Sequence, residues 1–349
     1  MSDWSKADWV DPALGWVPKP VDRLPKRVLI DFATRCNLRC PMCPVWGSDD
    51  QEAIDKVKGL LSVENARRIL DEVAAATPLV QPVLYGEPLL IPDVAERIRD
   101  MKSRGMTVAI NTNGVALSAQ MARDIIAAGV DSIFVSLDAV DPATFVKVRG
   151  VDKLEAIEAN ILRLLAERGR RSSPRVGVSF TITDANRAET DAFVERWCGV
   201  IDCLRTGLVF QDGTFPDMAV DKERETCPAL YSTMPVHHDG SVTICCLDGF
   251  RETTVGNILE EGAEAVWNGE AFAKVRYYHE TGQWEKVPFC TNCNGWLWHD
   301  FDEEIRDGLL IRRSPQMTYY NRIDRLENWQ GPLLGNHSPD LGALRDPTA

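Results

Sequence analysis

The ten cysteines of this chain include two groups whose spacing could bind metal. Three of them lie on one short stretch, at Cys36, Cys40 and Cys43. Five more follow after residue 220, at Cys227, Cys245, Cys246, Cys290 and Cys293. Grouped cysteines in a reducing compartment hold metal or perform chemistry more often than they form disulfides. Cys198 and Cys203 lie apart from both groups, and we expect them to be small buried apolar residues.

The first group has the spacing Cys36-x3-Cys40-x2-Cys43. Three thiolates on one loop can hold three irons of a cubane cluster and leave the fourth iron open to another ligand. An open metal position is what distinguishes a catalytic site from a closed structural one. The spacing alone leaves two alternatives, which are a zinc loop whose fourth ligand lies elsewhere and a chance grouping.

The cysteine loop follows the first of six short apolar runs that are rich in β-branched and aromatic residues, which predicts buried parallel strands. These runs cover residues 27–33, 79–84, 106–111, 131–137, 175–182 and 203–210. Helical patterns lie between them, at residues 62–76, 92–104, 118–128, 152–168 and 187–198. The alternation predicts a parallel sheet with helices outside. Six units are fewer than a closed eight-unit barrel needs, so we expect a partial, open (β/α)6 barrel with its site at the carboxyl ends of the strands.

The alternating pattern stops near residue 212. Residues 234–245 predict a β-hairpin that turns at Asp239-Gly240, and a helical pattern covers residues 258–280. The predicted α/β fold is therefore a partial barrel followed by a small hairpin-plus-helix domain. We expect an N-terminal extension, the barrel, the small domain and a peripheral C-terminal extension whose final fifteen residues are loose, at residues 1–25, 26–212, 213–300 and 301–349.

Composition excludes several partners. The formal net charge of −13 argues against a nucleic acid held through its phosphates. No apolar run approaches the roughly 20 residues that cross a bilayer, and the N-terminus lacks a signal-peptide core. We therefore expect a cytoplasmic protein. A short arginine run is expected to be solvated, at Arg168, Arg170, Arg171 and Arg175.

The loop CNLRCPMC, residues 36–43, resembles the cluster-binding loop of radical S-adenosylmethionine (SAM) enzymes, whose fold is a partial (β/α)6 barrel. Shorter motifs follow the next strands in the order of that family. They are Gly86-Glu87-Pro88, Thr112-Asn113-Gly114, Ser136-Leu137-Asp138 and Arg149-Gly150. Two positions depart from the family pattern: Tyr85 replaces a glycine, and Met42 stands where relatives carry an aromatic residue.

The resemblance implies that Cys36, Cys40 and Cys43 bind a 4Fe–4S cluster whose open iron takes SAM. It implies cofactor-binding roles for Gly86, Glu87, Pro88, Asn113, Ser136 and Arg149, with the Gly-Glu-Pro backbone on the SAM amino group and the arginine against its carboxylate. One electron would cleave SAM to a radical that abstracts a substrate hydrogen. Such chemistry needs an external low-potential electron donor of the flavodoxin or ferredoxin type.

The second group can close a four-coordinate site for a cluster or a zinc ion, with Cys227, Cys245, Cys290 and Cys293 as ligands. Beside the first cluster, the set resembles the short twitch form of the SPASM extension. That resemblance implies one auxiliary 4Fe–4S cluster, ligated entirely by protein, that relays an electron. Cys246 is spare. It could replace Cys245 as a ligand, be a buried thiol, or donate a hydrogen atom to a substrate radical.

Relatives with such extensions act on small molecules or on peptides. The cysteine spacing resembles that of the 2-deoxy-scyllo-inosamine dehydrogenase family, which favours oxidation or epimerisation of a sugar or aminocyclitol. Only about 25 residues precede the first predicted strand, which we expect to be too few for a leader-peptide module. The alternative is radical modification of a ribosomally made peptide or protein.

Aromatic and histidine residues of the last third have two interpretations each. Trp296 and Trp298, with His299 and Asp300, could line a substrate pocket or pack the extension onto the barrel. His237 and His238 are expected to be solvated turn residues rather than ligands.

Overall fold

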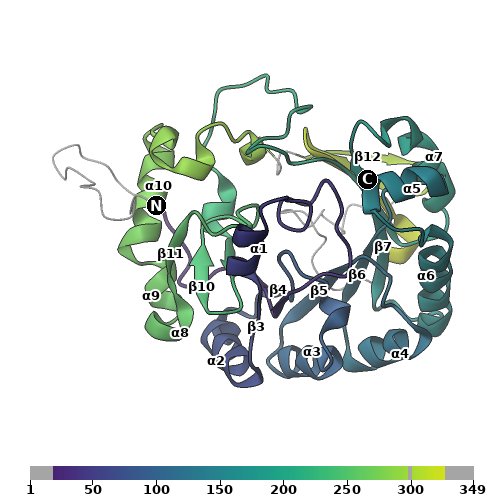
Figure 1. Ribbon diagram of the computed structural model, residues 1–349, viewed down its shortest axis with the longest axis horizontal. Coiled ribbons are helices and arrows are strands. Elements are labelled where there is room, and N and C mark those ends of the chain that lie inside the picture. Colours follow the sequence, from purple (N-terminus) through teal and green to yellow (C-terminus); the bar gives the residue numbers. More distant parts are fainter. Residues whose placement is uncertain (1–18, 298–300, 327–349) are drawn as a thin grey trace, which may run out of the picture.

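A computed structural model describes residues 19–297 and 301–326 of the chain. Twelve strands in these residues form one sheet, in the order β11-β10-β9-β1-β4-β5-β6-β7-β8-β14-β13-β12. Helices cover the outer face of its middle part, and the sheet curves around an interior (Figure 1). No helix in the described ranges has the length and apolar character that crossing a membrane requires.

The middle six strands are the predicted partial barrel. They run parallel in sequence order, as β1 (Arg27–Ile30), β4 (Leu79–Gln81), β5 (Thr107–Thr112), β6 (Ser132–Ser136), β7 (Arg175–Ile182) and β8 (Cys203–Leu208). The helices between them are α2 (Val63–Val73), α3 (Val94–Ser103), α4 (Ala119–Ala128), α5 (Pro142–Arg149), α6 (Leu154–Arg168) and α7 (Thr190–Trp197). The sequence prediction of alternating strands and helices is thus confirmed.

Local chemistry fixes the ends of these helices. Ser62 caps α2 by accepting a hydrogen bond from the Asn65 amide, and Ser118 caps α4 in the same way. Gly129 ends α4 at a φ of 89°, a left-handed conformation that glycine adopts without strain. Since the helix faces that carry buried aliphatic residues point inward, burial against the strands holds each helix on the barrel.

A smaller insertion follows the cysteine loop. It contains the helix α1 (Gln51–Val57) and the strand β3 (Gly59–Leu60), which pairs antiparallel with β2 (Ala33–Thr34) on the other side of the cysteine loop in sequence. The apolar side chains Val45, Trp46, Ile54 and Val57 form a separate small core beneath it. This core anchors the segment that leads from the cysteines back to α2.

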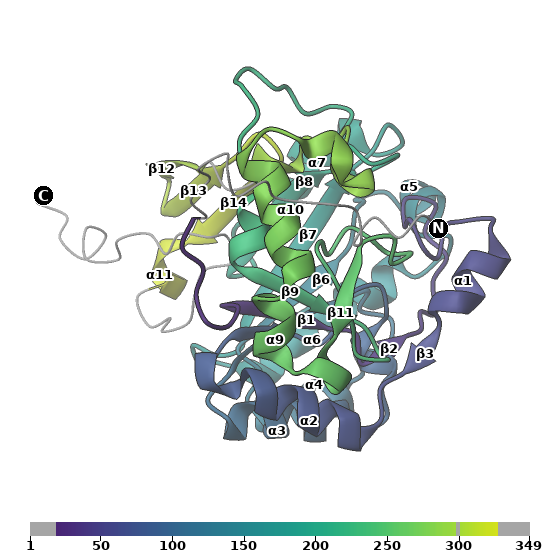
Figure 2. The ribbon, with the colours of Figure 1, turned by 90° about the vertical axis from the view of Figure 1, so that its left-hand side faces the viewer.

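The region after β8 extends the sheet past β1. The predicted hairpin is present as β9 (Thr233–Val236) and β10 (Ser241–Thr243), and β11 (Thr254–Asn257) follows. β9 pairs in parallel with β1, so the hairpin continues the barrel sheet instead of standing apart from it. Figure 2 shows α10 beside β11 and above α9.

The single helix predicted over residues 258–280 is wrong in one respect. It is divided into α8 (Ile258–Glu261), α9 (Ala263–Trp267) and α10 (Glu270–Glu280). Gly262 separates α8 from α9, and its φ of 87° and ψ of 154° are far from helical values. Asn268 and Gly269 separate the second pair. Low helix propensity of glycine at both breaks explains the division.

Residues 301–326 also differ from the peripheral extension that we expected. They form β12 (Asp302–Arg306), β13 (Leu309–Arg313), β14 (Met317–Arg322) and α11 (Ile323–Leu326). β14 pairs antiparallel with β8 over five residue pairs, so these strands extend the other edge of the barrel. Tyr319 packs there on Phe134 and Cys203. The final fifteen residues lie outside the described part of the chain.

Buried arginines hold this extension in place. Arg168 and Arg175 are buried, contrary to the solvated run that we expected, whereas Arg170 and Arg171 are exposed. The buried Asp202 carboxylate pairs with Arg168 and accepts a 2.8 Å hydrogen bond from Arg325 Nε. A charge that is buried is tolerated only when it is paired in this way.

Replacing this carboxylate should release the extension. We predict that Asp202→Ala lowers the free energy of unfolding by roughly 3–5 kcal/mol, because it leaves buried guanidinium charge unpaired. Asp324→Ala, which breaks the exposed pair with Arg322, should cost less than about 1 kcal/mol. Denaturant titration measures both. Equal losses in the two variants would contradict the assignment of Asp202 as the anchor.

Candidate active site

An inner cavity of 430 Å³ opens at the carboxyl ends of the barrel strands. The three cysteines of the first group line it, together with five of the six residues to which the family resemblance gave cofactor roles. These five are Gly86, Glu87, Asn113, Ser136 and Arg149. The sixth, Pro88, is buried at the start of a short 3-10 helix, Pro88–Leu90, directly behind the cavity wall. Cys246 also lines this cavity.

Donors surround the thiols of the cysteine loop. The Leu38 amide lies 3.4 Å from Cys36 Sγ, and the Trp46 amide lies 3.3 Å from Cys43 Sγ. The Arg149 guanidinium lies 3.6 Å from Cys40 Sγ. Hydrogen bonds to sulfur are the interactions that stabilise cluster thiolates, so the donor set fits an iron–sulfur cluster. Burial raises the pKa of the Cys36 thiol to about 11.

The Gly-Glu-Pro turn packs directly on the cysteine loop. A Cβ atom at Gly86 would lie 1.9 Å from the Ala33 carbonyl oxygen, so no other residue fits there. The Glu87 amide donates a 2.6 Å hydrogen bond to the carbonyl of Arg35, next to the first cysteine. This contact places the backbone of the turn at the cavity wall beside Cys36.

Glu87 joins the loops that follow β4 and β5. Its buried carboxylate accepts hydrogen bonds of 2.6 Å from the Thr112 hydroxyl, 2.7 Å from the Asn113 amide and 3.0 Å from the Leu89 amide. Burial raises the pKa of Glu87, and these donors act against that rise. Asn113 in turn donates 2.7 Å to Asn37 Oδ1 in the cysteine loop. The carboxylate therefore fixes three loops relative to one another.

Arg149 lies at the end of α5 and is buried beside the cysteine loop. It pairs with Asp138, which ends the Ser136-Leu137-Asp138 motif at a left-handed φ of 63°. Asp138 also accepts a 2.6 Å hydrogen bond from the Thr181 amide. Burial raises the pKa of Asp138, while the neighbouring Arg149 lowers it. Arg149 Nε has no hydrogen-bond partner within the described residues, which leaves a donor for a bound anion.

Sequence reasoning treated Tyr85 only as a departure from the family pattern. Tyr85 lines the inner cavity, and its backbone carbonyl accepts a 2.6 Å hydrogen bond from the Trp46 indole. Burial raises the pKa of its hydroxyl, and the thiols of Cys246, Cys245 and Cys43 add to that rise. Tyr85 thus lies between the two cysteine groups.

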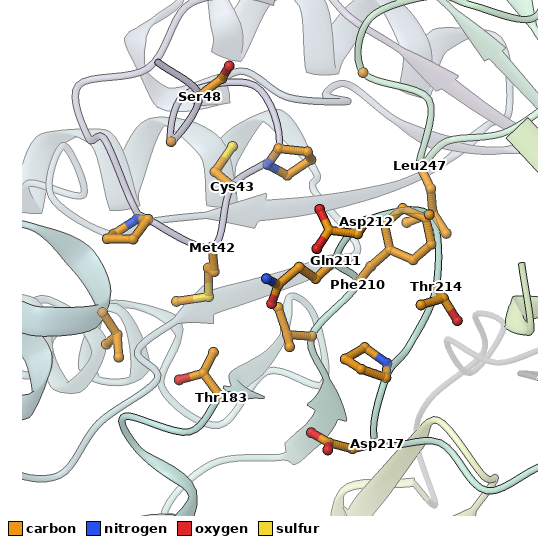
Figure 3. A pocket seen from close by; sticks show the side chains of 18 of the residues that line it. Met42, Cys43, Ser48, Thr183, Phe210, Gln211, Asp212, Thr214, Asp217 and Leu247 are labelled. Atoms are coloured by element: carbon orange, nitrogen blue, oxygen red, sulfur yellow. The ribbon is translucent and has the colours of Figure 1, made fainter. Parts of the chain in front are cut away.

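An outer cavity of 980 Å³ adjoins the inner one (Figure 3). Both cavities are lined by Met42, Cys43, Pro44, Val209, Phe210 and Leu247. Gln211, Asp212 and Thr214 contribute to its wall from the segment that follows β8. Sequence reasoning did not single out this segment, although its Asp212-Gly213 pair is a signal for a tight turn.

The second cysteine group gathers beside these cavities. Burial raises the pKa of the Cys290 and Cys227 thiols, and nearby thiols add to that rise, Cys227 and Cys293 on Cys290 and Cys293 on Cys227. The pKa of Cys245 is raised by its hydrogen bond with Cys246 and by burial, and the Cys293 and Cys227 thiols add to it. A hydrogen bond between Cys245 and Cys246 lowers the pKa of Cys246. Among residues 19–297 and 301–326, no three Cys, His, Asp or Glu side chains could hold a single metal ion. The ligand set therefore stays a prediction, which rests on its donor chemistry.

His237, His238 and Trp296 are at least partly buried and pack against neighbouring side chains. His237 is buried and lies 3.2 Å from the Thr243 hydroxyl, and His238 is half-buried against Arg251, so the expectation of solvated turn residues is wrong. Trp296 is buried against Phe215 and Met218, which agrees with packing and not with a pocket wall. Trp298, His299 and Asp300 lie outside the described residues.

Comparison with known proteins agrees with this arrangement. Residues 30–195 match the radical SAM superfamily, and residues 227–294 match the SPASM iron–sulfur cluster-binding domain. The chain contains a radical SAM domain followed by a SPASM domain. A radical SAM domain binds SAM and a 4Fe–4S cluster, and the SPASM region adds auxiliary iron–sulfur ligation, so the cofactors inferred from the cysteines are confirmed at this level. The boundary near residue 212 stays a prediction.

Two curated relatives and one solved structure illustrate what the chain is similar to. The tungsten-containing aldehyde ferredoxin oxidoreductase cofactor-modifying protein of Pyrococcus furiosus is 28% identical over 73% of this chain and 72% of its own length. The PqqA peptide cyclase of Streptomyces rochei is 31% identical over 43% of this chain but only 38% of its own length. The crystal structure of BtrN in complex with AdoMet and 2-DOIA covers 78% of this chain and 94% of BtrN, at 18% identity and a TM-score of 0.54. That last similarity shows the fold.

The Glu87 carboxylate offers a test of the radical SAM site. Glu87→Gln replaces one acceptor oxygen by an amide donor and leaves at least one buried N–H or O–H unpaired. We predict a SAM affinity lower by about tenfold, because such a loss costs about 1–3 kcal/mol. Anaerobic equilibrium dialysis measures it. The exposed Glu96→Gln serves as the control, and an unchanged affinity in Glu87→Gln would refute the role of the carboxylate in ordering the site.

Proposed function

We propose that this radical SAM enzyme oxidises an alcohol group of a sugar- or aminocyclitol-type small molecule. The observation that carries the proposal is that both cysteine groups reach the inner cavity. Cys246 of the second group and Cys43 of the first both line it. A substrate held there would lie between the radical source and an auxiliary electron acceptor. A solved structure of the same fold, BtrN, binds AdoMet and 2-DOIA.

Oxidation of an alcohol removes a hydrogen atom from carbon, a proton from the hydroxyl and one electron. When bound, SAM and the first cluster would supply the radical chemistry that removes the hydrogen atom, and an auxiliary cluster held by the second cysteine group would supply the acceptor for the electron. The electron for SAM cleavage comes from an external low-potential donor. The residues of this chain bind and orient the reactants and exclude water.

Particular residues have proposed roles in this scheme. Arg149 holds the SAM carboxylate with the donor that its pair with Asp138 leaves free. The backbone at Gly86 holds the SAM amino group. Asn113 holds the neighbouring cysteine loop through its hydrogen bond to Asn37. Asp212, which lines the outer cavity, accepts the hydroxyl proton. Cys246 distinguishes two outcomes, since a thiol that returns a hydrogen atom to the substrate radical would make the reaction an epimerisation.

Modification of a peptide is the second candidate. It is favoured by the size of the outer cavity, 980 Å³, which exceeds what a single sugar ring requires. It also agrees with the similarity to PqqA peptide cyclases. A peptide side chain could enter the inner cavity while the backbone lies in the outer one. We propose the cytoplasm as the compartment for either function.

Deuterium transfer tests the proposal. The enzyme is reduced anaerobically with SAM and a panel of sugars and aminocyclitols that carry deuterium on their carbinol carbons. We predict one deuterium in 5′-deoxyadenosine for each ketone formed, and dehydrogenation that persists in Cys246→Ala. Mass spectrometry of both products provides the measurement.

Two results would redirect the assignment. Replacement of the carbinol deuterium by solvent hydrogen without ketone formation, lost in Cys246→Ala, would show epimerisation. Transfer of deuterium only from a labelled peptide, and from none of the polyols, would establish the peptide alternative.

A further inference from the structure

One amide side chain connects the second cysteine group to the outer cavity. Asn294 Oδ1 accepts a 2.8 Å hydrogen bond from the Phe215 amide and a 3.0 Å hydrogen bond from the Thr214 hydroxyl. Asn294 Nδ2 donates a 2.9 Å hydrogen bond to the Phe215 carbonyl. The three bonds join positions about 80 residues apart in the sequence, and they satisfy both the acceptor and the donor side of the amide.

The segment that Asn294 holds is a tight turn at the cavity mouth. Gln211 and Thr214 exchange two backbone hydrogen bonds, of 2.8 and 3.0 Å. Asp212 and Gly213 lie between them at φ values of 50° and 80°, so both central residues are left-handed. This is the backbone of a type I′ turn, in which the side-chain directions are fixed. Gln211, Asp212 and Thr214 line the outer cavity from it (Figure 3).

The other end of the connection is a proposed cluster ligand. Asn294 directly follows Cys293, whose Sγ accepts a 3.3 Å hydrogen bond from the Gly295 amide. The space here is filled: a Cβ atom at Gly295 would lie 3.1 Å from the Phe215 ring and 3.3 Å from Cys293 Sγ. The sulfur, the glycine and the Phe215 ring therefore constrain one another.

A second contact runs beside the first. The Phe210 ring lies 5.1 Å from Phe215 and 6.0 Å from Phe289, between ring centroids, and Phe289 directly precedes Cys290. Phe210 also lines both cavities. Both cysteines of the Cys290–Cys293 pair are thus one residue away from a contact with the segment that follows β8.

We propose that Asn294 is a positioning residue through which the auxiliary cluster orders the substrate-facing turn of residues 211–214. Binding of a cluster by Cys290 and Cys293 fixes the backbone at Asn294, because metal ligation and local folding are coupled. The fixed amide then holds Thr214 and Phe215, and the rigid turn presents Asp212 to the substrate. A chain that lacks the auxiliary cluster would keep its SAM site but lose a defined substrate wall. This inference rests on the auxiliary ligation in the proposed function.

Hydrogen–deuterium exchange of the anaerobically reconstituted enzyme tests the proposal without any substrate. The amides of Gln211, Thr214 and Phe215 are followed in wild type, Asn294→Ala and Cys290→Ala/Cys293→Ala. We expect exchange at these amides to be at least about tenfold faster in both variants, as protection follows local opening. Amides of the first cysteine loop should keep their wild-type rates. Thr291→Ala is the matched control, since its hydroxyl donates a 3.3 Å hydrogen bond to the Pro288 carbonyl, just before the Cys290–Cys293 pair.

Iron content separates the possible failures. Asn294→Ala should retain all the iron of the wild type, and the double cysteine variant should lose about half of it. If exchange at Gln211 and Thr214 stays slow in the double variant despite that loss, the link between cluster and turn is refuted while the proposed function stands. If the double variant loses no iron, the auxiliary ligation itself is wrong. Asn294→Asp, which retains both acceptor bonds, should show intermediate exchange. Exchange as fast as in Asn294→Ala would contradict the geometry.

Discussion

The constraint on which the rest of this structure depends is the close packing of the three thiols of the first cysteine group with the loops at one end of a parallel sheet. Sulfur needs donors when it carries charge in a buried site, and those donors come from elements far apart in sequence. The loop's own amides reach Cys36 and Cys43, and Arg149 at the end of α5 reaches Cys40. The Glu87 carboxylate then holds the surrounding loops together. A partial barrel provides this convergence because its strands all end at the same edge.

The open edges of the barrel are as informative as its centre. A parallel sheet of six strands would expose two unpaired edges, which is a liability for a folded protein. Here β9 covers the edge at β1, and β14 covers the edge at β8. The first of these additions also brings Cys245 and Cys246 to the site, so the same strand pairing that protects the barrel positions the second cysteine group. The pairing of β9 with β1 therefore serves both the stability of the barrel and the position of the second cysteine group.

Much of this arrangement could be predicted from local patterns. Six strands, their helices, the Asp239-Gly240 hairpin and the cysteine loop all follow from periodicity and spacing, which act over a few residues. The residues with family-like motifs meet in one cavity because order along the chain determines order in a parallel sheet. Features that depend on distant pairing could not be predicted. Arg168 and Arg175 look solvated in sequence because their partners, Asp202 and Asn321, are 34 and 146 residues away. The role of Asn294 is hidden for the same reason.

The central claim is that the chain holds two separate clusters, one for SAM and one auxiliary. The most direct measurement counts iron and acid-labile sulfide after anaerobic reconstitution, in wild type and in the Cys36→Ala/Cys40→Ala/Cys43→Ala variant. Two cubanes predict about eight irons per chain in wild type and about four in the variant. About four irons in wild type and none in the variant would contradict the claim, because the second cysteine group would then hold no cluster and could not accept the electron.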